Sequence, residues 1–88
     1  MTSTEVLSMY ENIAGLTGKM AVAAQMGDWN GLDLLENQCA AAAVPTIGGV
    51  PKLEGGARQR KIDLLRQILA NDRAVRDVTE PWMGQLNG

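Results

Sequence analysis

The sequence predicts an all-α fold: an antiparallel three-helix bundle in which a helical hairpin is followed by a long third helix. Two observations predict it. Apolar residues recur every three or four positions in three segments, which is the period of an amphipathic helix. Helix-capping residues mark the ends of these segments, and a Pro- and Gly-rich stretch separates the second segment from the third. With 88 residues, the chain is expected to form a single domain, residues 1–88.

The first helix is expected at residues 3–26. Thr2 and Glu5 have the spacing of a capping box, and Gly27 can take the positive φ that ends a helix. Gly15 and Gly18 inside this helix indicate either a close approach of a neighbouring helix or a shallow groove for a partner helix. The apolar stripe consists of Val6, Met9, Tyr10, Ile13, Leu16, Thr17, Met20, Ala23 and Ala24.

The second helix is expected at residues 28–43, with Asp28 as its N-cap. Because the Gly27–Asp28 turn is so short, the first two helices should lie side by side and antiparallel. The apolar stripe of the second helix consists of Trp29, Leu32, Leu35, Cys39, Ala42 and Ala43, and Leu34 falls outside it.

Residues 44–56 contain two Pro and four Gly, which predicts a loose connector, with a partner-contact arm as the alternative. The third helix is expected at residues 57–79. Glu80-Pro81 marks a boundary or a kink, so residues 80–88 are expected to form a tail or one further helical turn. The apolar positions of the third helix are Ile62, Leu65, Ile68, Leu69, Val75 and Val78, with Leu64 alongside.

The composition excludes several functions. The chain has no His and one Cys, so it lacks the usual zinc ligands, an internal disulfide and imidazole-based acid–base catalysis. We therefore expect no enzyme, no cofactor and no metal site. The net charge of −2 argues against direct nucleic-acid binding. No apolar stretch approaches the roughly 20 residues that a bilayer requires, so a cytoplasmic protein without a membrane span is expected.

The charges are unevenly distributed along the chain. Residues 1–57 carry two basic and six acidic side chains, a net −4, and residues 58–80 carry six basic and four acidic ones, a net +2. The bases lie at the start of the third helix, where the helix dipole disfavours them. Two interpretations stay open: charge complementarity between the third helix and the first two, or a polar docking surface for a partner.

The apolar core is expected to be small, because eleven of the hydrophobic residues are Ala. We therefore predict that the second and third helices leave an apolar groove for another polypeptide. Asp72 and Arg76 have the spacing of an i, i+4 ion pair. They form either an ordinary surface pair or the polar contacts at the edge of the groove that fix the position of a bound chain. The groove is expected to contain Leu65, Ile68, Leu69 and Val75 from the third helix and Leu32, Leu35 and Cys39 from the second, supported by Tyr10 and Ile13 from the first.

These features together resemble the FliT family of flagellar type III export chaperones. Gly27-Asp28-Trp29 and Ile68-Leu69-Ala70-Asn71-Asp72 are the more specific motifs, and the resemblance covers nearly the whole chain. Its three stretches are Tyr10-Glu11-Asn12-Ile13, then Gly27-Asp28-Trp29 with Leu32, Leu35 and Glu36, and then residues 62–72 with Arg76 and Glu80-Pro81-Trp82.

The resemblance implies a non-enzymatic chaperone that binds the C-terminal segment of the filament-capping protein FliD, prevents its premature assembly and delivers it to the export gate protein FlhA. Some members of the family also bind the export ATPase complex or the flagellar master regulator FlhDC, which implies feedback on transcription. In the family, the groove between the second and third helices holds the client, and a fourth helix can cover it. Because the sequence ends at Gly88, we expect that fourth helix to be missing or truncated.

A second hypothesis comes from a different class of protein. The same apolar face can drive self-association, which would make the chain a structural or assembly bundle and leaves a homodimer open. The two hypotheses differ in whether the oligomer dissociates when a client is added.

Overall fold

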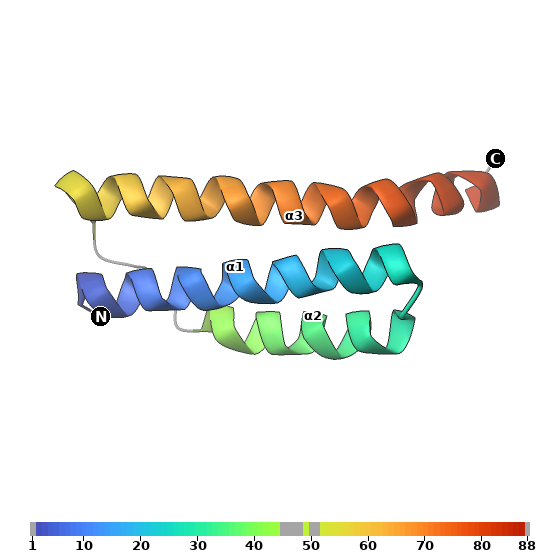
Figure 1. Ribbon diagram of the computed structural model, residues 1–88, viewed down its shortest axis with the longest axis horizontal. Helices are drawn as coiled ribbons and strands as arrows, with labels where there is room; N and C mark the ends of the chain where they lie inside the picture. The colour runs from blue at the N-terminus through green and yellow to red at the C-terminus, as the bar shows by residue number, and fades with distance from the viewer. Residues whose placement is uncertain (1, 45–48, 50–51, 88) are drawn as a thin grey trace.

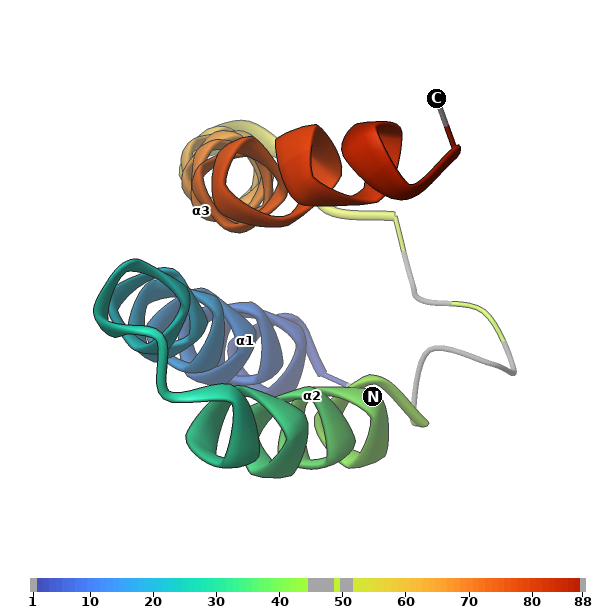
Figure 2. The same ribbon diagram turned by 90° about the vertical axis from the view of Figure 1, so that its right-hand side faces the viewer.

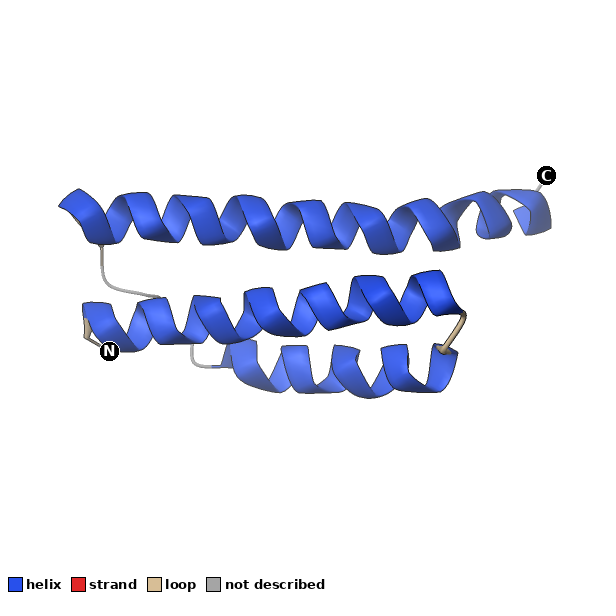
Figure 3. Ribbon diagram, viewed as in Figure 1, coloured by secondary structure: helices blue, strands red, loops and turns tan. Residues whose placement is uncertain are grey.

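The computed structural model describes residues 2–44, 49 and 52–87, and this part of the chain is almost entirely helical (Figure 3). It contains three helices: α1 (Ser3–Met26), α2 (Trp29–Ala43) and α3 (Gly55–Asn87). Figure 1 shows that α1 and α3 run in the same direction and that α2 runs opposite to both. The molecule is elongated, with extents of 45 × 22 × 21 Å. The predicted all-α architecture, a hairpin followed by a long third helix, is confirmed.

The start of α1 is fixed by the predicted capping box. The backbone N–H of Glu5 donates to the Thr2 hydroxyl, and the backbone N–H of Thr2 donates to the Glu5 carboxylate, each over 3.2 Å. Two N–H groups at the start of the chain are thereby satisfied reciprocally.

The turn between α1 and α2 also follows the sequence prediction. Gly27 has a φ of 72°, a conformation that costs glycine little, and its N–H donates to the carbonyl of Ala24. The N–H of Asp28 donates to the carbonyl of Ala23, which completes a Schellman-type ending. Asp28 then caps α2 by accepting from the N–H of Gly31 over 3.0 Å. Two residues therefore end one helix and begin the next.

The bounds of α3 differ from the prediction at both ends. The helix begins at Gly55, two residues early, and it continues through Pro81 to Asn87, so the expected tail at residues 80–88 is helical as far as residue 87. A proline removes one N–H and bends a helix, but the turns on either side keep their own hydrogen bonds. Figure 2 shows the last turns of α3 leaning away from the line of the earlier ones.

The connector between α2 and α3 is only partly described, since residues 45–48 and 50–51 lie outside the described residues. Its last part is not loose, because Leu53 is only 3% exposed. An apolar side chain buried this deeply anchors the chain just before α3 begins. The prediction of a loose connector is therefore wrong for this part of the segment.

α1 is the central helix. It packs against both α2 and α3, whereas among the described residues no Cα atom of α2 lies within 8 Å of one in α3. Figure 2, which looks along the helices, shows α2 and α3 on two different sides of α1. The backbones of the two outer helices therefore approach α1 more closely than they approach each other.

A polar contact sets the register between α1 and α3. The Asn71 side-chain amide donates to the carbonyl of Ala14 over 3.3 Å and to the hydroxyl of Thr17 over 3.1 Å. Thr17 is buried, and its hydroxyl donates in turn to the carbonyl of Ala14 over 3.0 Å. A slide of α3 along α1 would take the half-buried Asn71 amide away from both of its acceptors, which makes the register specific.

The core is small and rich in alanine. One cluster joins Ala21, Ala23 and Ala24 of α1 to Leu32 of α2 and Val75 of α3. Towards the start of α1, the buried residues are Val6, Met9, Ile13 and Ala14, with Leu53 and Leu64 from the second half of the chain.

The residue of α3 that packs most tightly is Leu64, which is 2% exposed, although the sequence placed it beside the main apolar stripe. We expect Leu64→Ala to lower the free energy of unfolding by about 3 kcal/mol, because it removes buried apolar surface and leaves a cavity. Urea denaturation followed by circular dichroism measures the change. The matched control is Leu34→Ala, since Leu34 is 62% exposed and its truncation should cost less than about 0.5 kcal/mol. Equal losses in the two variants would contradict the assigned core.

Gly15 does not serve the close helix approach that the sequence suggested. A Cβ added at Gly15 would meet no heavy atom within 4 Å, and one added at Gly18 would meet the Asn71 amide nitrogen at an ordinary 3.7 Å. We therefore expect Gly15→Ala to raise the free energy of unfolding by about 0.5–1 kcal/mol, because alanine loses less backbone entropy in a helix. The thermal midpoint should rise accordingly. A lower midpoint would show that the open space is needed.

The capping box makes the start of α1 sensitive to pH. The hydrogen bond from the backbone N–H of Thr2 is the largest cause that holds the pKa of Glu5 below its ordinary value of 4.5. A lowered pKa means that the stabilisation is complete above pH 4.5 and is lost as the pH falls through the lowered value. In an NMR titration, the Thr2 amide shift should follow this transition, and Glu5→Gln should abolish it. A midpoint at or above 4.5 would contradict the capping bond.

Candidate functional site

The candidate site lies along one side of α3. Leu65, Leu69, Asp72 and Arg76 follow one another at i, i+4, i+7 and i+11, which places them on one side of the helix, and we call this set the α3 flank. Ile68 and Val75 lie next to it, towards the side of α3 that meets α1. The sequence pattern had grouped all six residues, and the structure separates them into an outer and an inner row.

Some residues predicted to bind a partner are core residues. Leu32 and Val75 are 7% and 8% exposed and belong to the central cluster, and the supporting residue Ile13 is buried as well. These side chains hold the helices together. A partner that docks on the bundle as it stands cannot contact them extensively.

The other predicted apolar residues are half-buried, with one exception. Leu65, Ile68 and Cys39 are partly covered, and Leu35 packs against the central cluster. The exception is Leu69, which is 66% exposed. It therefore presents apolar surface to solvent in the middle of the α3 flank.

Tyr10, which was expected to support the groove, lies next to a cation of α3. The Lys61 ammonium lies 5.8 Å from the centre of the Tyr10 ring, within range of a cation–π interaction. Tyr10 and Lys61 are far apart in the chain, so no local sequence pattern pairs them.

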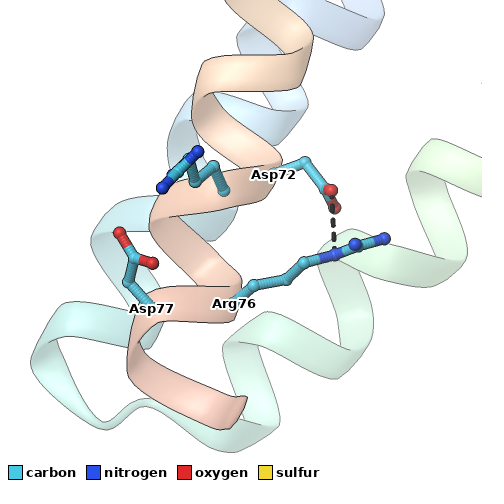
Figure 4. Close-up of a pocket in the computed structure, with 4 residues that line it drawn as sticks. Asp72, Arg76 and Asp77 are labelled. Atoms are coloured by element: carbon cyan, nitrogen blue, oxygen red, sulfur yellow. Dashed lines mark ion pairs between the residues drawn. The ribbon is translucent and has the colours of Figure 1, made fainter. Parts of the chain in front are cut away.

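Asp72 and Arg76 form the expected i, i+4 ion pair. The Arg76 Nε lies 3.0 Å from the Asp72 Oδ2, and both side chains are substantially exposed. Figure 4 shows the pair on one side of α3 and Asp77 on the other. These residues and Arg73 line a shallow pocket of about 290 Å³. Exposed pairs of this kind add little stability, so the pair mainly fixes the position of polar atoms at the end of the α3 flank.

The charge difference between the halves of the chain is scarcely used inside the bundle. Among the described residues, one ion pair joins α3 to another helix: Arg60 and Glu11, with Nε and Oε1 3.7 Å apart and both side chains about half exposed. The interpretation that the charges of α3 complement those of α1 and α2 therefore accounts for little of the pattern. Most arginines of α3 face solvent.

Exposed apolar side chains at the hairpin were missed by the sequence analysis. Trp29 was expected on the inner stripe of α2 but is 54% exposed, and Met26 and Val22 at the end of α1 are exposed as well. Trp29 is the first residue of α2, so no preceding turn of its own helix covers it. Periodicity alone does not reveal this effect at a helix end.

The described residues offer no arrangement suited to catalysis or metal binding. They contain no group of three or more His, Cys, Asp or Glu side chains that could hold a metal ion. Partial burial raises the pKa of the Cys39 thiol, which makes it less reactive. Within the same part of the chain, none of the helices has the length and apolar character needed to cross a bilayer.

Comparisons with known proteins identify the family. The family model described as "Flagellar protein FliT" matches residues 7–88. The crystal structure of flagellar protein FliT from Bordetella bronchiseptica is similar, with 34% sequence identity and a TM-score of 0.81, over 93% of this chain and 95% of that one. The comparison with curated proteins gives no match. FliT is a family of non-enzymatic flagellar chaperones. Both the family model and the similar three-helix structure show that this chain belongs to the FliT family.

Proposed function

We propose that this chain is a flagellar export chaperone that binds the C-terminal segment of the filament-capping protein FliD along the α3 flank. Binding there would keep FliD from assembling early. The chaperone would act in the cytoplasm and deliver its client to the export gate protein FlhA. Membership of the FliT family supports the flagellar role.

The observation that carries the proposal is the exposure of Leu69. It lies in a row with the half-buried Leu65, and Ile68 adds apolar surface beside them. A client helix could lay its own apolar side chains on this row, as amphipathic segments do in other helical grooves. Burial of a leucine stabilises a complex by roughly 1.5–3 kcal/mol, so one exposed leucine can dominate the affinity.

The packing of the helices supports the same surface. Because no described Cα atom of α2 lies within 8 Å of one in α3, the two backbones stay apart, and a client on the inner edge of α3 could also reach α2. The Asp72–Arg76 pair would then supply polar contacts at one end of the bound segment. The exposed Leu34 lies outside the apolar stripe of α2, which makes it a suitable reference position.

The proposal also includes regulation. Some FliT-like chaperones bind the export ATPase complex or the master regulator FlhDC, and this chain would do so as a protein-binding module. Its own net charge of −2 disfavours direct contact with DNA.

The proposal predicts that Leu69→Asp abolishes binding of a FliD C-terminal peptide, because a charge replaces the apolar contact. Calorimetry with the purified chain measures the affinity. The helicity should stay at the wild-type level, since Leu69 is 66% exposed. The matched control is Leu34→Asp: it places the same charge at a position that is 62% exposed and should leave the affinity within about twofold.

Two outcomes would overturn this assignment. Wild-type affinity in Leu69→Asp would exclude the α3 flank, and equal losses in both variants would indicate a nonspecific effect of charge. Light scattering during the titration distinguishes a chaperone from a self-assembling bundle, because a client that occupies the same face should dissociate any dimer.

A further inference from the structure

Arginines of α3 border the α3 flank without partners of their own. Arg58, Arg66 and Arg73 are exposed and form no ion pair among the described residues, and we call these three the basic stripe. Residues seven or eight apart lie on one side of a helix, so the three guanidinium groups project into the same sector of α3. Leu69 falls inside this sector, four residues before Arg73.

Folding does not explain the basic stripe. Arg58 lies at the first turn of α3, where the helix dipole disfavours positive charge, and Arg66 and Arg73 lie too far along the helix to gain from the dipole. The acidic side chains of α2 do not compensate them either, since Asp33 and Glu36 are exposed and have no ion pair among the described residues. Charges that neither stabilise their helix nor pair within the bundle are available to a partner.

We propose that the segment bound on the α3 flank is an amphipathic helix that carries a row of Asp or Glu side chains next to its apolar face. This inference rests on the proposed function and adds the chemistry of the client. The apolar side chains would cover Leu65 and Leu69, while the acidic row lies over Arg66 and Arg73. The charges set the side and the register on which the segment docks, and they raise the rate of association more than the final affinity.

The partner that fits this surface is a polypeptide and not a nucleic acid. Asp63, Asp72 and Asp77 are interleaved with the arginines along α3, so α3 presents no continuous positive surface to a phosphate backbone. An exposed leucine at the centre of the stripe also requires an apolar counterpart. An acidic amphipathic helix supplies both.

The test uses two synthetic helical peptides with the same leucine face, one with a flanking row of Glu and one with Gln at those positions. We expect the full chain to bind the Glu peptide about tenfold more tightly at low salt, from a few exposed charge pairs. The difference should shrink towards zero at about 1 M salt, where the Debye length falls to about 3 Å.

Charge reversal assigns the effect to the basic stripe. Arg66→Glu and Arg73→Glu should each weaken the Glu peptide about fivefold and leave the Gln peptide unchanged. The matched control is Lys19→Glu, an equal change of charge at an exposed position of α1, which should alter neither affinity by more than twofold. Circular dichroism checks that helicity is retained.

The outcomes separate this inference from the proposed function. If the FliD peptide binds and depends on Leu69, but Glu and Gln peptides bind equally or all three reversals act alike, the inference is wrong and the proposed function stands. If an unstructured polyglutamate peptide binds as tightly as the helical one, the surface is a general anion site and the inference is wrong. If the FliD peptide does not bind at all while the Glu peptide does, the proposed client is wrong and the chemistry stands.

Discussion

The packing of α1 against both other helices is the constraint on which the structure depends. α1 supplies most of the buried residues, and many of them are alanines, which let a neighbouring helix approach closely but bury little apolar surface. α1 therefore buries two of its faces, one against α2 and one against α3, whereas each outer helix buries one face against α1. The backbones of α2 and α3 therefore pack on α1 and not on each other.

The polar contact between Asn71 and Thr17 determines which residues of α3 become available. With Asn71 fixed on α1, Leu64, Ile68 and Val75 turn inwards on the same side, and Leu69 turns outwards. A hydrophobic stripe alone would tolerate rotation of α3, since Leu65 and Leu69 are as apolar as Leu64 and Ile68. The half-buried Asn71 amide removes that freedom, because a rotated helix would take it away from both of its acceptors on α1. The exposure of Leu69 is thus a consequence of the hydrogen bond between Asn71 and Thr17.

Local signals predicted the helix ends well and the helix faces less well. The Thr2–Glu5 box and the Gly27–Asp28 turn depend on residues within four positions, so the sequence states them directly. The burial of Leu64 and Leu53 depends on where α3 sits on α1, which no local pattern encodes. The local cost of Pro81 left a boundary and a kink as alternatives, and α3 continues past it. Within the candidate site, the Asp72–Arg76 pair was predictable from its spacing, and the division into core and surface rows was not.

Several arginines of α3 are exposed and add little to the stability of the fold, which makes them candidates for contact with a partner. Arg58, at the first turn of α3, works against the helix dipole by about 0.3–1 kcal/mol, and the half-exposed pair of Arg60 with Glu11 adds little stability. In a chain of this size, whose core is built largely from alanine, such losses are a noticeable fraction of the total stability. Stability alone would favour an acid at Arg58. Arg66 and Arg73, on either side of the exposed Leu69, form no ion pair among the described residues, and a partner that carries acids gives them a role.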